Sequence, residues 1–176
     1  MLASAAAYFF PDQPNYLQPT ITADRGVVHL EARYNYEDRQ STSAFVGWNL
    51  GFGETVKVEL TPMVGGLFGS TVGVVPAFEL DLVWRRIEAS VEGELVLDVQ
   101  DAHNSFVYNW SELAVWATDW LRAGIVTQRT RVYQTARELE VGVLAGTSLS
   151  RFEGTVYFFN PGASDRFVVV ALGVRF

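Results

Sequence analysis

One short run of the chain, Asp101–Ala102–His103–Asn104–Ser105, contains the residue types used for nucleophilic catalysis. A histidine close to a serine can take the hydroxyl proton and so make that oxygen a nucleophile, and an acidic residue can orient the imidazole. Asp101 precedes His103 by two residues, and Glu112 is the nearest acidic residue downstream. A solvated polar loop is the simpler interpretation of the same run.

A second set of charged residues alternates with apolar residues along extended segments. We predict that these charges point into a common interior as a luminal charge network. Its predicted members are Arg33, Lys57, Glu79, Asp81, Glu92, Glu94, Arg129, Arg131, Glu138 and Glu140. An unpaired buried charge is costly, so such a network must be paired or hydrated. Three interpretations stay open: a packed ionic core, a narrow hydrated pore whose acidic wall favours cations, and a proton relay or ligand site.

Composition excludes several classes of function. The net charge of −7 and the isoelectric point near 4.8 argue against nucleic acid as a partner, because no basic stripe is present. The chain has no cysteine and two histidines, so we expect no metal and no cofactor. No run approaches the roughly 18 uninterrupted apolar residues of a membrane helix.

The elements that would position these residues are strands, because apolar and polar residues alternate from residue 27 to the end. We predict ten strands, with eight as the fallback if two short segments are loops. The ten are 27–36, 43–52, 55–68, 71–84, 87–98, 105–117, 121–133, 138–149, 153–159 and 166–176. Most have about the 9–11 residues that a tilted membrane strand needs.

The predicted strands have an apolar face that must meet lipid. In the clearest one, 87–98, Ile87, Val91 and Leu95 share one face while Glu88 and Glu92 share the other. A soluble barrel would put its apolar face inside, but nearly every segment here has a strongly apolar face and no obvious water-facing exterior. We therefore predict an all-β, closed, antiparallel, up-and-down transmembrane barrel at 27–176 with short loops.

Residues 1–26 are predicted to be an irregular lead-in. Pro11, Pro14 and Pro19 cannot donate to a strand ladder, and no strong period is visible. Residues 1–7 resemble either the tail of a secretory signal or a linker remnant. Residues 8–25 could lie in the barrel mouth.

The last residues, VVVALGVRF, place Val170, Leu172, Val174 and Phe176 at alternating positions. This ending resembles the C-terminal insertion signal of bacterial outer-membrane β-barrel proteins, which the barrel-assembly machinery reads. The resemblance implies an outer-membrane location with both termini in the periplasm. It implies no particular activity, because such barrels include pores, enzymes and anchors.

Two narrower resemblances compete for the loop at residues 101–105. His103 and Ser105 resemble the His-x-Ser of lipid A deacylase barrels, whereas Asp101 and His103 resemble the Asp-x-His of omptin proteases, which are much longer proteins. Arg129 and Arg131 allow another envelope function, since arginine forks suit the phosphates of lipopolysaccharide.

Together these patterns predict an integral outer-membrane barrel with a largely occluded, charged lumen and a structural or envelope-contact role. The alternatives are a narrow passive pore for small solutes or ions and a lipid-modifying hydrolase, although enzymatic activity is not the expectation. The partners expected are outer-membrane lipids and lipopolysaccharide, the barrel-assembly machinery during insertion, and an unidentified envelope component.

Overall fold

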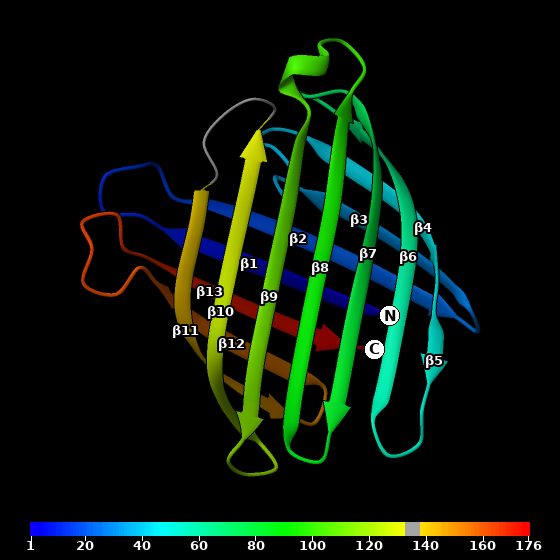
Figure 1. The fold of residues 1–176 in the computed structure, drawn as a ribbon, viewed down its shortest axis with the longest axis vertical. Coiled ribbons are helices and arrows are strands. Elements are labelled where there is room, and N and C mark those ends of the chain that lie inside the picture. Colours follow the sequence, from blue (N-terminus) through cyan, green and yellow to red (C-terminus); the bar gives the residue numbers. More distant parts are fainter. Residues whose placement is uncertain (133–137) are drawn as a thin grey trace.

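The chain folds into one antiparallel sheet that closes on itself as a barrel (Figure 1). The structure is a computed structural model, and it describes residues 1–132 and 138–176. The strands are β1 (Leu2–Phe9), β2 (Tyr16–Arg25), β3 (Val28–Tyr34), β4 (Thr42–Trp48), β5 (Leu50–Phe52), β6 (Lys57–Phe68), β7 (Gly73–Trp84), β8 (Ile87–Asp98), β9 (Phe106–Trp116), β10 (Leu121–Val132), β11 (Glu138–Leu149), β12 (Phe152–Phe159) and β13 (Phe167–Arg175). A short 3₁₀ helix, η1 (Ala102–Asn104), lies in the loop before β9.

Each strand pairs with its neighbours in the sequence, and the two ends of the chain close the barrel. Strand β1 pairs with β13 from Leu2 opposite Arg175 onward, and the Phe176 amide donates to the Met1 carbonyl at 3.0 Å. Strand β5 continues the ladder of β4 along β6 beyond Asn49. Among the described residues, twelve strands therefore surround the lumen, with β5 as a short extra strand.

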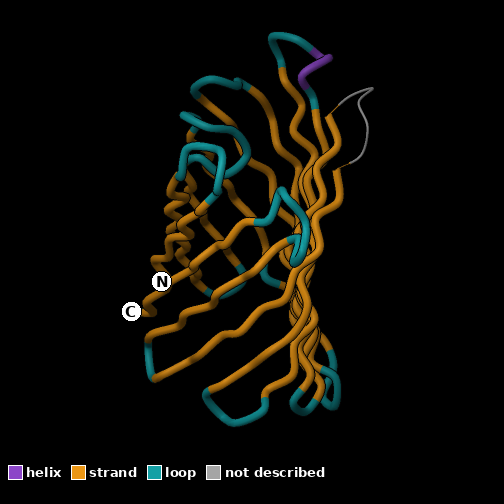
Figure 2. The backbone as a smooth tube through the Cα atoms, turned by 90° about the vertical axis from the view of Figure 1, so that its left-hand side faces the viewer, coloured by secondary structure: helices purple, strands orange, loops and turns teal. Residues whose placement is uncertain are grey.

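The two ends of the barrel differ, and we name them by what they carry. The terminal end holds both chain termini and the turns at 26–27, 53–56, 85–86, 117–120 and 150–151. The loop end holds the connections at 10–15, 35–41, 69–72, 99–105 and 160–166. Figure 2 shows both termini close together on one wall of the barrel.

The prediction of ten strands, with eight as the fallback, is wrong, because the N-terminal region expected to be an irregular lead-in contributes β1 and β2. The sequence hides β1 because small alanines fill most of both faces, so hydropathy hardly alternates. Pro19 lies within β2 but outside the β2–β3 ladder, which starts at Thr20. Its missing N–H therefore interrupts no bond to β3.

The outer face of the barrel is apolar on almost every strand. Ile125 is 53% exposed, Leu139 57% and Leu172 64%, whereas their strand neighbours Val126 and Leu144 are buried in the lumen. An outer surface of this kind fits the hydrocarbon of a membrane rather than water. No helix in the described part of the chain has the length and apolar character needed to cross a membrane.

The lumen holds two apolar clusters in its loop-end half and is polar in its terminal-end half. One apolar cluster is centred on Tyr8, Phe159 and Phe167, and a second on Phe45 and Leu67. These clusters hold the loop-end half of the walls together. The charged residues gather on the walls of the terminal-end half.

Candidate functional site

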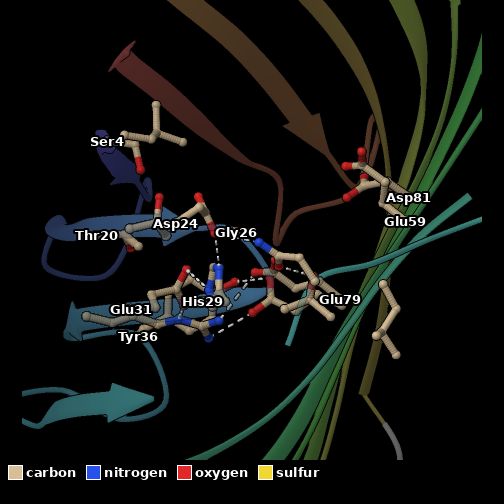
Figure 3. Close-up of a pocket in the computed structure, with 18 residues that line it drawn as sticks. Ser4, Thr20, Asp24, Gly26, His29, Glu31, Tyr36, Glu59, Glu79 and Asp81 are labelled. Carbon is tan, nitrogen blue, oxygen red and sulfur yellow. Dashed lines mark hydrogen bonds and ion pairs between the residues drawn. The ribbon is translucent and has the colours of Figure 1, made fainter. Parts of the chain in front are cut away.

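The largest cavity occupies the terminal-end half of the lumen, with a volume of about 590 Å³. Its wall comes from β1, β2 and β3 on one side and from β6, β7 and β8 on the other (Figure 3). Six carboxylates line it among the described residues, against one arginine and one histidine. The carboxylates are Asp24, Glu31, Glu59, Glu79, Asp81 and Glu92.

Arg33 is the centre of the charge cluster at the inner end of this cavity. It projects from β3 and is 3% exposed. Its guanidinium lies 2.8 Å from Glu92 and 3.7 Å from Glu79, which face each other across the β7–β8 ladder. It also forms ion pairs with Glu31 and Glu94 and lies 3.8 Å from Glu37. One cation therefore serves five carboxylates in the described chain.

Aromatic rings narrow the lumen beside this cluster. The Arg33 guanidinium lies over the Tyr36 ring at 4.3 Å and over the Phe45 ring at 4.7 Å. The Tyr36 hydroxyl donates to Glu92 at 2.6 Å, and its ring meets Tyr108 edge-on at 5.9 Å. These contacts fix the guanidinium beside three aromatic rings, and we call this level of the lumen the constriction.

The loop that follows β3 adds one buried carboxylate to the constriction. Glu37 accepts a hydrogen bond from the Ser43 hydroxyl at 2.7 Å. Burial raises the pKa of the Glu37 carboxyl above its ordinary value, although Arg33 and Ser43 act in the opposite direction. Glu37 therefore takes up a proton at a higher pH than an exposed glutamate does.

A polar chain runs along β2 and β3 toward the terminal end. His29 Nδ1 lies 2.8 Å from Asp24, and the Asn49 amide donates to the same carboxylate oxygen at 2.8 Å. The Thr61 hydroxyl donates to Asn49 at 2.9 Å. Figure 3 shows Asp24, His29 and Glu31 grouped together, with Glu59 and Asp81 apart from them on the facing strands.

The opposite wall of the terminal-end half holds a second cluster, with one arginine between two glutamates. Arg122 on β10 lies 2.9 Å from Glu88 and 3.2 Å from Glu112. The Trp116 indole donates to Glu88 at 2.7 Å, and the Tyr157 hydroxyl donates to Glu112 at 2.7 Å. This cluster lines a cavity of about 400 Å³ that shares Ser4 and Asp81 with the larger one.

Smaller cavities continue toward the loop end. One of about 210 Å³ is lined by Tyr36, Glu37 and Tyr108, so Tyr36 borders both this cavity and the large one. Another, of about 120 Å³, shares Tyr8 and Tyr16 with it. Successive cavities therefore follow the barrel from the terminal end to the loop end, with the Arg33 constriction between the two halves.

The structure brings together only part of the charge network predicted from the sequence. Arg33, Glu79, Glu92 and Glu94 form one cluster, and Asp81 lines the cavities beside it. Glu140 faces the loop-end lumen away from Arg33, where it lines the small cavities. Lys57 is exposed at the first residue of β6. The side chains of Arg131 and Glu138 lie outside the described residues.

Arg129 lies on the outer face of β10, not in the lumen where the sequence interpretation placed it. Its neighbours in the strand, Gln128 and Thr130, line the loop-end cavities, so alternation turns Arg129 outward. Hydropathy misled the prediction because β10 carries Gly124 and Val126 inside and polar residues outside. In this part of β10 the usual arrangement of apolar residues outside and polar residues inside is therefore reversed.

Sequence reasoning left several residues out of the network. Glu31 alternates with Arg33 on one strand face, so this spacing could have identified it. Tyr36 ends the predicted strand 27–36 and Glu37 begins the loop expected after it, and only the closed barrel brings them to Arg33 and Glu92. No group of His, Asp or Glu in the described chain has a geometry that would hold a metal ion.

In the loop run considered for catalysis, the Asp101 carboxylate and the Ser105 hydroxyl each accept a backbone hydrogen bond. The Asp101 carboxylate accepts from the backbone N–H of His103 at 2.9 Å and so caps η1. The Ser105 hydroxyl accepts from the Asp98 backbone at 3.2 Å. Glu112, the candidate orienting residue, faces the lumen with Arg122.

The predicted insertion signal lies on the outside of the last strand. Val170, Leu172 and Val174 face outward, and Phe176 is 71% exposed at the terminal end. Trp84, Trp120 and Phe152 are also exposed at that end. At the loop end, by contrast, Tyr36 and Phe159 point into the lumen.

Comparisons with solved structures identify this fold as that of a porin. A KdgM porin matches with a TM-score of 0.74 at 10% identity, over 100% of this chain and 99% of that one. A second structure, the KdgM porin in complex with disordered oligogalacturonate, gives 0.75 at 9% identity over the same shares. A NanC porin gives 0.66 at 8% identity, over 99% of this chain and 98% of the other. No protein-family model and no curated protein matches the chain.

The class defined by these observations is a porin-like transmembrane β-barrel, with neither a long constriction loop nor a separate domain among its described residues. The low identities limit the likeness to the fold. The lumen of this chain must therefore be interpreted from its own side chains.

Proposed function

We propose that this chain is a narrow passive pore of a bacterial outer membrane that favours small cations. The observation that carries the proposal is the series of polar cavities along the lumen, in which Tyr36 borders the cavities of both halves. A barrel that served structurally would gain more from a fully packed interior, because unfilled polar space adds no stability.

Excess negative charge supports the preference for cations. The ion pairs of Arg33 leave several carboxylates without a counter-cation of their own. Glu37 and Glu94 each keep one buried oxygen that accepts no hydrogen bond from the described protein. Carboxylates that line a narrow lumen attract cations and repel anions.

This lumen differs in charge from one that would suit the ligand of a structural neighbour. Oligogalacturonate, which one KdgM structure contains, is a polyanion. The acidic wall around Arg33 would repel it. We therefore expect acidic oligosaccharides to be poor solutes for this pore, although the barrels share a fold.

The constriction sets the size of the permeant solute. Arg33, Tyr36 and Tyr108 are held by ion pairs and ring contacts, so the opening at that level is narrow. We expect steady channels of small conductance. The apolar outer face and the aromatic rim support an outer-membrane location, with the terminal end in the periplasm.

Conductance in a planar bilayer tests the proposal. Wild-type protein should give steady channels whose reversal potential in a KCl gradient has the sign set by potassium. Glu92→Gln should reduce this selectivity, because it removes a carboxylate at the constriction. Glu54→Gln, in the exposed turn between β5 and β6, is the matched control and should leave it unchanged. Absence of steady channels would instead favour an occluded barrel with a structural role.

A further inference from the structure

A polar patch interrupts the apolar outer face of β9 and β10. It consists of Asn109 and Ser111 on β9 with Thr127 and Arg129 on β10, and we call it the polar notch. Arg129 is directly opposite Asn109 in the ladder, and Thr127 is opposite Ser111. Trp110 and Gln128, the intervening residues, face the lumen, where Trp110 meets Phe159 and Gln128 lines two cavities, so the notch residues face outward.

Apolar side chains surround the polar notch. Ile125 and Leu113 lie on its terminal side and are 53% and 47% exposed. Leu139, which pairs with Arg129, is 57% exposed on β11. Val107 lies between Asn109 and the loop end and is 49% exposed. The notch is therefore inside the apolar band and not above it.

Hydrogen bonds hold the two β9 residues of the polar notch, whereas Arg129 on β10 is unpaired among the described residues. The Asn109 amide donates to the Glu92 carbonyl at 2.8 Å, and the Ser111 hydroxyl donates to Asn109 at 3.0 Å. The Arg129 guanidinium makes no ion pair or hydrogen bond with any residue that the structure describes. A cation on a lipid-facing strand costs most at the bilayer midplane and little near the interface.

We propose that the polar notch binds a phosphate of a phosphorylated glycolipid of the outer leaflet, with Arg129 as the phosphate-binding residue. Arg129 is three residues from the end of β10, about 10 Å along the strand, so its side chain can reach the headgroup level. An arginine fork suits a phosphate. The proposal rests on the orientation given above, with the loop end outward.

The deeper half of the polar notch favours a glycolipid over a phospholipid. Ser111 and Thr127 lie two residues further into the apolar band than Asn109 and Arg129. Lipid A has amide and hydroxyl groups below its phosphates, and these can meet the two side chains. A diacyl phospholipid has only ester groups at that depth.

Native mass spectrometry of the intact barrel in detergent tests the proposal with three probes: diphosphoryl lipid A, dephosphorylated lipid A and phosphatidylglycerol. Wild type should bind diphosphoryl lipid A most tightly. Arg129→Gln should bind it about tenfold more weakly, since a charge-assisted bond is lost. Arg151→Gln, at an exposed arginine of the terminal-end turn, should bind like wild type.

Equal binding by Arg129→Gln and wild type would overturn the site, and equal binding of phosphatidylglycerol would overturn the choice of lipid. A shift of Arg129→Gln from oligomer to monomer, with lipid binding unchanged, would identify a second copy of the chain as the occupant. Ion conductance of the same variant separates the two proposals, because loss of lipid binding should leave cation selectivity unchanged.

Discussion

At the scale of single residues, Arg33 determines the charge balance of the lumen. Replacing it with methionine would leave five carboxylates around a buried neutral side chain. Breaking buried ion pairs from one side costs about 3–5 kcal/mol, so Arg33→Met should unfold at markedly lower denaturant concentration. Urea titration in lipid vesicles measures this, with Arg33→Lys as the control that keeps the charge. A midpoint equal to that of wild type would show that the carboxylates do not need this cation.

At the same scale, Glu37 should make the cation selectivity of the pore depend on pH. Burial raises its pKa, so on acidification Glu37 loses its charge before exposed glutamates do. As the pH is lowered, we expect cation selectivity to begin falling at a pH above about 4.5, the range in which exposed glutamates take up a proton. In Glu37→Gln the part of the decline that comes from this carboxyl should be missing. Reversal potentials measured across a pH series would reveal this. Superimposable curves for the two proteins would remove Glu37 from the permeation path.

At the scale of elements, β1 tests whether the N-terminal segment spans the membrane. Ala5 faces outward, whereas its neighbour Ser4 lines both large cavities. Arginine on the lipid face near the midplane costs about 2–4 kcal/mol, and arginine in an acidic lumen costs far less. Ala5→Arg should therefore lower the free energy of unfolding more than Ser4→Arg does. Equal effects in a urea titration would argue that β1 is not a lipid-facing strand.

The same elements explain how far the sequence could predict the structure. Strong alternation identified β8, with Glu92 and Glu94 on its inner face, and it identified β3 with Arg33. It failed in β1, where alanine fills the faces, and in β10, where polar residues face outward. The carboxylate of Glu37 could not be predicted, because its position depends on how a loop folds back over Arg33.

At the scale of the whole molecule, the chain is a porin-like barrel, and the charge of its lumen follows from the side chains that line it. The fold is shared with KdgM and NanC porins at about 8–10% identity. Such a likeness leaves the solute open, because the residues that line a pore can change while the strands remain. The acidic clusters and the aromatic constriction are the features of this lumen on which the proposed selectivity rests.

The central claim is that the lumen conducts small cations, and the reversal potential of single channels in a KCl gradient tests it most directly. The account predicts steady small channels whose reversal potential has the sign of the potassium equilibrium potential. It predicts a reduced value in Glu92→Gln and an unchanged one in Glu54→Gln. A reversal potential of the opposite sign, or a membrane that stays silent after verified insertion of folded barrels, would contradict it.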